Sequence, residues 1–125
     1  MRILLADKQD ITRAGLMYII NSMENVEYKY IEDKAELFVA LNEDQDCVVI
    51  LDYTIFDIND AAELAIINER FTKTRWIIFS EDLSIDFTKI IIATSTKFSI
   101  LLKESSMQEI TEAIMFAING NRFIC

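Results

Sequence analysis

Four polar residues, each at the end of a short apolar run, could together handle a phosphoryl group. The run RILLA precedes Asp7, CVVIL precedes Asp52, and WIIF and SILL precede Ser80 and Lys103. A carboxylate can attack a phosphoryl donor and become an aspartyl phosphate. That reaction needs positive charge and hydrogen-bond donors around the transferring oxygens, and an ammonium and a hydroxyl would supply both.

The apolar runs are typical of strands that are buried on both faces of a parallel sheet. In open α/β sheets the binding site lies outside the carboxyl ends of the strands, at the point where the strand order reverses. The four polar residues are far apart in the sequence, yet each follows or closes such a run. We therefore expect them to meet in one cleft.

Strand-like and helix-like segments alternate along the whole chain. Strands are expected at 2–6, 26–31, 47–51, 75–79 and 99–102, and helices at 11–21, 33–43, 59–71, 84–93 and 106–118. Because crossovers between parallel strands are right-handed and helices must cover both faces, this alternation predicts one α/β domain. Its expected topology is a flavodoxin-like (βα)₅ doubly wound parallel sheet with strand order 2-1-3-4-5.

The helix ends and inner faces can also be read from the sequence. Asp10 is the expected N-cap of the first helix, with Ile11 on the inner face. Ser106 and Glu109 have the spacing of a capping box at the last helix, and Met107 is expected on its inner stripe.

The bulk properties exclude several classes of function. The chain has 125 residues, of which 52% are hydrophobic, and a net charge of −9. This negative charge argues against direct binding of the chain by itself to nucleic acid or to anionic membranes. The absence of histidine excludes imidazole catalysis and imidazole metal ligands. No run is long enough for a membrane helix and the start does not resemble a signal peptide, so a cytoplasmic protein is expected, with Cys47 in its core.

Over essentially its whole length the chain resembles a response-regulator receiver domain. The opening ILLADKQDITRAGL, with Arg13 and Gly15, is similar to the start of receivers from LuxR/NarL-type transcription regulators. VVILDYTIFD resembles the phosphoacceptor strand and its loop. WIIFSED and ILLKES resemble the strands that end in the switch hydroxyl and the lysine. The final EAIMFAINGNRFIC resembles the last helix and the start of a linker.

This resemblance implies a role for each site residue. Asp52 corresponds to the phosphoacceptor, and Ser80 and Lys103 to the groups that contact the phosphate. Asp7, Asp52 and the backbone carbonyl of Thr54 correspond to Mg²⁺ ligands. Ile100 stands at the aromatic switch position.

The resemblance also implies partners and a wider domain context. Residues 1–125 would be the receiver part of a longer chain with a C-terminal helix-turn-helix domain, and DNA would be contacted only through that absent domain. A sensor histidine kinase is the expected phosphodonor. A homodimer would form through the face made by residues 84–118 or through the last helix. The implied role is that of a signalling module and not an enzyme.

The chain departs from the family pattern at four positions, one of which is Glu104, where the family usually has a proline or an aspartate. Lys8 replaces the second acid of the opening pair, which removes a metal ligand and predicts weakened Mg²⁺ binding. Phe56 replaces a proline that follows the phosphoacceptor, and Ile100 lacks the aromatic ring. One hypothesis is that the Lys8 ammonium enters the pocket and pairs with Asp52 or Asp7. The plainer interpretation is an exposed loop lysine.

Three classes of function therefore remain open from the sequence. The first is a receiver that gates transcription, with atypical or phosphorylation-independent regulation. The second is a degenerate receiver that acts purely as an interaction or dimerisation module. The third is a cofactor protein or phosphatase on the same fold. It is disfavoured because the segment after Asp7 lacks a phosphate-binding loop and Asp52-Tyr-Thr lacks the second acid of an Asp-x-Asp motif.

Overall fold

The computed structural model describes every residue except 56, 57, 59 and 125, so the substitution at Phe56 lies outside the described residues. The strands are β1 (Arg2–Ala6), β2 (Glu27–Tyr30), β3 (Cys47–Leu51), β4 (Arg75–Ser80) and β5 (Phe98–Leu102). The α-helices are α1 (Asp10–Asn21), α2 (Lys34–Glu43), α3 (Ala61–Arg70), α4 (Ile85–Thr94) and α5 (Met107–Ile118), and a 3₁₀ turn covers Tyr53–Ile55.

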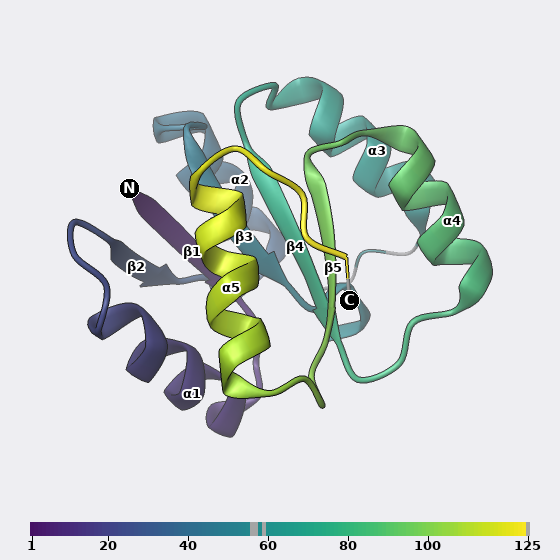
Figure 1. The fold of residues 1–125 in the computed structure, drawn as a ribbon. Helices are drawn as coiled ribbons and strands as arrows, with labels where there is room; N and C mark the ends of the chain where they lie inside the picture. Colours follow the sequence, from purple (N-terminus) through teal and green to yellow (C-terminus); the bar gives the residue numbers. More distant parts are fainter. Residues whose placement is uncertain (56–57, 59, 125) are drawn as a thin grey trace.

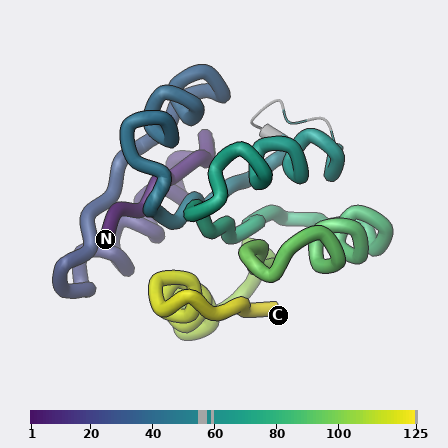
Figure 2. The backbone as a smooth tube through the Cα atoms, turned by 90° about the horizontal axis from the view of Figure 1, so that it is seen from above, coloured from purple at the N-terminus to yellow at the C-terminus, as the bar shows by residue number. Residues whose placement is uncertain are grey.

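The strands form one parallel sheet in the order β2-β1-β3-β4-β5, which confirms the expected topology. Helices α1 and α5 cover one face, and α2, α3 and α4 cover the other (Figures 1 and 2). Because successive side chains of a strand point to opposite faces, Ile3 and Leu5 pack toward α1 and α5, whereas Leu4 and Ala6 pack toward the other layer.

Two expectations about inner helix faces are wrong. Ile11 is 89% exposed and Met107 is 52% exposed. The buried stripe of α1 is set by Leu16, Ile19 and Ile20. At 3.6 residues per turn, Ile11 is rotated about 140° from Leu16 and therefore points away from the sheet. The buried residues of α5 are Ala113, Ile114 and Ala117, and its small alanines face the sheet in place of Met107.

The helix starts follow the capping rules with one exception. The capping box of Ser106 and Glu109 is present at α5. The expected N-cap of α1 is wrong, because Asp10 is the first helical residue and Gln9 has the N-cap position. The side chain of Gln9 makes no capping hydrogen bond, so it is available for the contacts described below.

The segment after α5 returns along the outer edge of β5. Gly120 adopts the left-handed region (φ 79°) that lets the chain turn back. Ile100 donates its N–H to the carbonyl of Phe123 at 2.9 Å, and the two backbones form a parallel bridge between Ile100 and Ile124. Arg122 donates to carbonyls near the end of α4, at 2.9 Å for that of Ser95. The β5 edge is therefore partly covered by the chain itself.

Across the described residues, the helices all lack the length and apolar character needed to cross a membrane. Cys47 is buried in β3 as expected, and its burial raises the pKa of the thiol to about 11.

Candidate functional site

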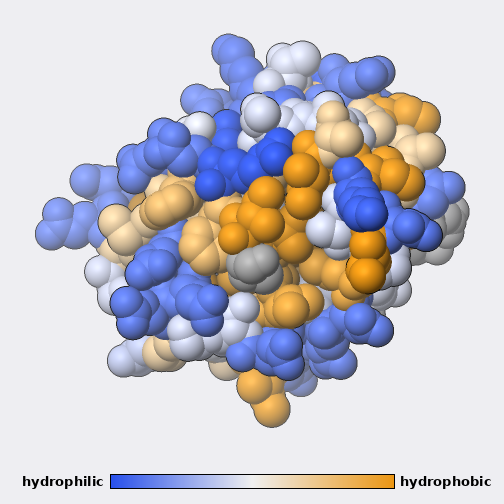
Figure 3. All heavy atoms as spheres, turned by 45° about the vertical axis from the view of Figure 1, so that its right-hand side comes forward, coloured by the Kyte–Doolittle hydropathy of each residue, from blue (hydrophilic) through white to orange (hydrophobic). Residues whose placement is uncertain are grey.

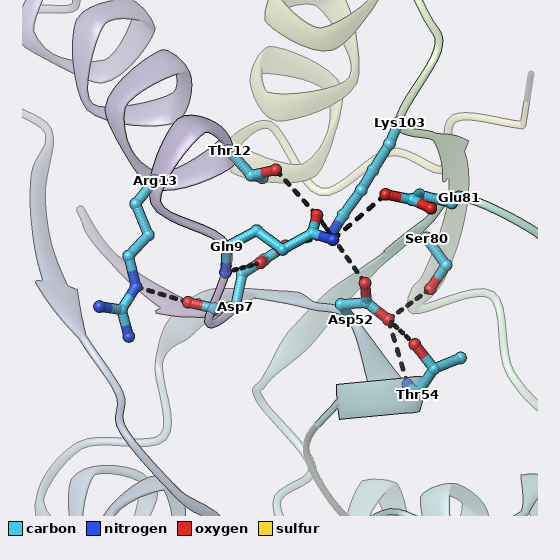
Figure 4. Close-up of polar contacts among 9 residues, drawn as sticks. All are labelled: Asp7, Gln9, Thr12, Arg13, Asp52, Thr54, Ser80, Glu81 and Lys103. Carbon is cyan, nitrogen blue, oxygen red and sulfur yellow. Dashed lines mark hydrogen bonds and ion pairs between the residues drawn. The ribbon is translucent and has the colours of Figure 1, made fainter.

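The four predicted site residues meet at the carboxyl end of the sheet. Asp7 follows β1, Asp52 follows β3, Ser80 ends β4 and Lys103 follows β5 (Figure 4). The last residues of β1 and β3, Ala6 and Leu51, are paired in register. The two aspartates are therefore neighbours at the switch point of the sheet, as the expected strand order required.

Lys103 bridges the two carboxylates. Its Nζ lies 2.7 Å from Oδ2 of Asp52 and 2.9 Å from Oδ2 of Asp7. The side chain of Lys103 is 8% exposed, and those of Asp7 and Asp52 are 0% and 3% exposed. Buried charges are costly unless they are paired, and Lys103 provides such a partner for both carboxylates.

The other oxygen of Asp52 is surrounded by donors. Oδ1 accepts hydrogen bonds from the Ser80 hydroxyl at 3.0 Å, from the Thr54 hydroxyl at 2.6 Å and from the Thr54 N–H at 3.1 Å. Sequence reasoning considered only the carbonyl of Thr54 and missed its N–H and its hydroxyl. The spacing offered a signal for the N–H, because an aspartate side chain often accepts from the backbone two residues further on.

These contacts shift the pKa values of the pair in opposite directions. Burial by itself would raise the pKa of Asp52, but the hydrogen bonds from Lys103, Thr54 and Ser80 and the charge of Lys103 hold it below its ordinary value. Burial would likewise lower the pKa of Lys103, but the hydrogen bonds and charges of Asp52 and Asp7 hold it above its ordinary value. Both groups are therefore ionised at neutral pH.

Asp7 is held by the start of α1. Its Oδ1 accepts the backbone N–H of Gln9 at 2.9 Å, and its main-chain carbonyl accepts Nε of Arg13 at 2.6 Å. The resemblance pointed to Arg13 without a role, and the structure gives it one, namely to fasten α1 to the end of β1. Arg13 also pairs with Glu32 at 3.3 Å, which ties in the segment after β2.

Gln9 is the site residue that sequence reasoning missed. Its Oε1 accepts from Lys103 Nζ at 2.5 Å, and its Nε2 donates to Oε1 of Glu81 at 3.1 Å (Figure 4). Nothing in the local sequence distinguishes Gln9 from an ordinary loop glutamine. Its partners come from the ends of β4 and β5, more than 70 residues further along the chain, so only the tertiary structure reveals them.

Lys8 is exposed, and Lys103 forms an ion pair with each of the two site carboxylates. The hypothesis that the Lys8 ammonium pairs with Asp52 or Asp7 therefore stays a prediction. Ile100 is 4% exposed and packs in the core toward α4, so the switch position is filled by a buried aliphatic side chain.

The residues present do not fit a Mg²⁺ ion in this arrangement. Mg²⁺ takes an octahedron of oxygen ligands, usually with one or two carboxylates. Here Oδ2 of both aspartates faces an ammonium, and both Oδ1 atoms accept hydrogen bonds from protein donors. In the described part of the chain, no group of three or more His, Cys, Asp or Glu side chains is arranged to hold a metal ion.

No protein-family model matches the sequence, and no curated protein matches it either. Solved structures do. The isolated receiver domain of RcsB from Salmonella enterica serovar Typhimurium, in the apo form, is 19% identical with a TM-score of 0.82. The match covers 100% of this chain and 92% of that chain.

Two further structures show the same likeness. A two-component response regulator of the LuxR family from Aurantimonas sp. SI85-9A1 is 21% identical with a TM-score of 0.80, and the match covers 99% of this chain and 88% of that chain. The signal receiver domain of NarL from Mycobacterium tuberculosis is 20% identical with a TM-score of 0.77, and the match covers 96% of this chain and 97% of that chain. The chain therefore has the fold of response-regulator receiver domains, which confirms the resemblance at the level of fold.

Proposed function

We propose that this chain is the signal-receiver domain of a two-component-type response regulator. It controls transcription through an attached DNA-binding domain, and Asp52 accepts the phosphoryl group. The observation that carries the proposal is the convergence of Asp7, Asp52, Ser80 and Lys103, with one ammonium bridging both carboxylates. The likeness to receiver domains of LuxR/NarL-type regulators supports it.

The chemistry of the step follows from the contacts of Asp52. A carboxylate oxygen of Asp52 forms a new bond to phosphorus, and the bond from phosphorus to the donor's leaving group breaks with its electron pair going to that group. The depressed pKa of Asp52 keeps its carboxylate ionised and able to attack. Ser80 donates to Asp52 and Lys103 forms an ion pair with it, so both groups lie where they can stabilise the charge on the phosphoryl oxygens.

Regulation at this site is atypical in our proposal. Lys8 stands where the family has a metal-binding acid, and the two site carboxylates are engaged by protein donors. Phosphoryl transfer from a histidine kinase is then slow, or the domain is regulated by a partner. The second candidate, a degenerate receiver that acts only as an interaction module, is favoured by the same saturation of Asp52 with hydrogen bonds.

A mass measurement tests the first candidate against the second. The wild-type protein is incubated with acetyl phosphate, with and without Mg²⁺, beside an Asp52→Ala control, and the intact mass is followed over time. We expect one added phosphoryl group on the wild type and none on the control. No addition to either protein would sink the phosphoacceptor role and leave the interaction module.

A Lys8→Asp variant sharpens this test. Restoring the acid adds an oxygen ligand next to Asp7 and changes the local charge by two units. We expect Mg²⁺ to accelerate phosphorylation of this variant more than that of the wild type. An unchanged response to Mg²⁺ would contradict the view that Lys8 is what weakens metal binding.

We also propose that the domain forms a homodimer through the face made by α4, β5 and α5, together with the C-terminal segment. Figure 3 shows apolar side chains gathered on this side of the molecule. Exposed apolar residues there include Ile90, Phe116 and Ile124. A contiguous apolar patch on a protein surface marks an interaction site. Sedimentation of an Ile90→Glu variant tests this proposal.

A further inference from the structure

Three oxygens surround the ammonium of Lys103. An ammonium carries three N–H donors and no acceptor. Three acceptors lie within hydrogen-bond distance of Nζ, namely Oδ2 of Asp52 at 2.7 Å, Oδ2 of Asp7 at 2.9 Å and Oε1 of Gln9 at 2.5 Å. An anion that binds at Nζ therefore competes with these three oxygens for the ammonium.

Gln9 is the acceptor that gives way most easily. The ammonium attracts the full negative charge of a carboxylate more strongly than the dipole of a neutral amide. Displacing Asp7 or Asp52 would also separate a buried carboxylate from the ammonium of Lys103. Gln9 is neutral, partly exposed, and can turn its amide toward water.

The Gln9 side chain also spans the mouth of the pocket. Beyond Lys103, its Nε2 donates to Oε1 of Glu81 at 3.1 Å, and its Oε1 accepts from the Thr12 hydroxyl at 3.3 Å (Figure 4). Glu81 directly follows β4, so this one amide connects the loop after β1 to the loop that leads into α4. Displacing the amide breaks the connection.

The remaining contacts of Gln9 do not require its side chain. Gln9 is the N-cap residue of α1, but its side chain makes no capping hydrogen bond. Its contact with Asp7 is made by the backbone N–H, which any residue except proline would keep. A substitution at this position therefore removes the amide from the pocket and leaves the start of α1 in place.

We propose that Gln9 is a built-in competitor of the phosphoryl group. Its amide oxygen occupies the position at Lys103 that a phosphoryl oxygen takes, and it is displaced when the anion enters. The displaced amide releases Glu81 and so frees the loop before α4. Gln9 is in this sense a positioning residue that acts through Lys103. The nature of the anion rests on the function proposed above.

Two readouts test this inference. The first is the labelling rate of Lys103 with an amine-reactive acetyl ester, mapped by peptide mass spectrometry against the exposed Lys29 of the same molecule. The second is the rate of mass gain with acetyl phosphate. The variant is Gln9→Ala, and the matched control is Glu81→Gln, which keeps an oxygen that can accept from the Gln9 amide.

We expect Gln9→Ala to increase both rates several-fold and Glu81→Gln to leave both near the wild-type values. Gln9→Glu, which substitutes a charged acceptor for the neutral amide, should reduce the rate of phosphorylation. Unchanged labelling of Lys103 in Gln9→Ala would overturn the inference. The inference would also be overturned if the wild type is phosphorylated and Gln9→Ala is phosphorylated no faster.

The failure of the proposed function has a different signature. Faster labelling of Lys103 in Gln9→Ala, with no phosphoryl group added to any variant, would support Gln9 as the group that covers Lys103. That result would overturn phosphoryl acceptance by Asp52 and with it the identity of the anion. Thermal unfolding of each variant checks that α1 is intact.

Discussion

The pocket and the α4–β5–α5 face are two regions joined by β5. The pocket is lined by charged and polar groups, whereas the face carries exposed apolar side chains. Lys103 follows β5 and enters a pocket in which two buried carboxylates are paired. Ile100 lies in the middle of β5, where its backbone pairs with the returning C-terminal segment. The charged groups of the pocket pair with one another. The face, in contrast, leaves apolar side chains such as Ile90 and Phe116 in contact with water.

This difference indicates where each region can respond to a change. A charged pocket with matched partners resists change until an ion or a proton alters its balance of charge. Covering an exposed apolar face lowers the free energy, because apolar surface is removed from water. We therefore expect substitutions in the pocket to change stability and its dependence on pH, and substitutions on the face to change association.

The largest expected effect comes from removing the cation of the pocket. Lys103→Met keeps most of the side-chain volume but removes the ammonium that bridges the buried carboxylates of Asp7 and Asp52. Breaking a buried ion pair in this way costs about 3–5 kcal/mol of the free energy of unfolding. Urea unfolding at neutral pH measures it.

The matched control for this prediction is the double variant Lys103→Met with Asp52→Asn. Removing one carboxylate charge should recover part of the lost free energy, because only the carboxylate of Asp7 then lacks the Lys103 ammonium. A double variant as unstable as Lys103→Met alone would mean that lost packing, and not charge, causes the effect.

The pH dependence of stability comes next. The pKa of Asp52 is depressed in the folded state, so its contribution is fully present above the ordinary value of 3.8 and is lost as the pH falls through the folded value. The pKa of Lys103 is raised, so its contribution is fully present below 10.5 and is lost as the pH rises through the folded value. We expect a plateau of stability between these limits.

Chemical unfolding across the pH range, with Asp52→Asn beside the wild type, measures this profile. The variant should lose less stability than the wild type on the acid side, because the group that must be protonated is gone. Equal acid sensitivity of the two proteins would show that other carboxylates dominate acid unfolding.

The smallest expected effect on stability comes from the face. Ile90→Glu introduces a charge on α4 at a residue that is already exposed, so the free energy of unfolding should change little. Dimerisation should weaken by at least about tenfold, which corresponds to about 1.4 kcal/mol. Sedimentation at a series of protein concentrations measures the dimerisation constant.

Val39→Glu is the matched control, because Val39 is an exposed β-branched residue on α2, away from this face. It should leave association unchanged. A wild type that stays monomeric at every concentration, or an equal effect of the two variants, would contradict dimerisation through α4–β5–α5.

The sequence alone determined the sheet and the principal members of its pocket. Unbroken apolar runs such as those before Asp7 and Asp52 belong to central parallel strands, and the carboxyl ends of such strands lie at one edge. Strand order and right-handed crossovers then brought residues from four distant segments together. The convergence of Asp7, Asp52, Ser80 and Lys103 was predictable for this reason.

Only the tertiary structure decided which atoms touch. Local spacing suggested that Asp10 would cap α1 and that Ile11 would face inward, but packing of α1 on the sheet selected another stripe and left Ile11 in water. The contacts of Gln9 with Lys103 and Glu81 join segments whose separation along the chain carries no periodic signal. Periodicity records which face of an element is buried, whereas hydrogen-bond partners depend on distances between elements, and those distances exist only after folding.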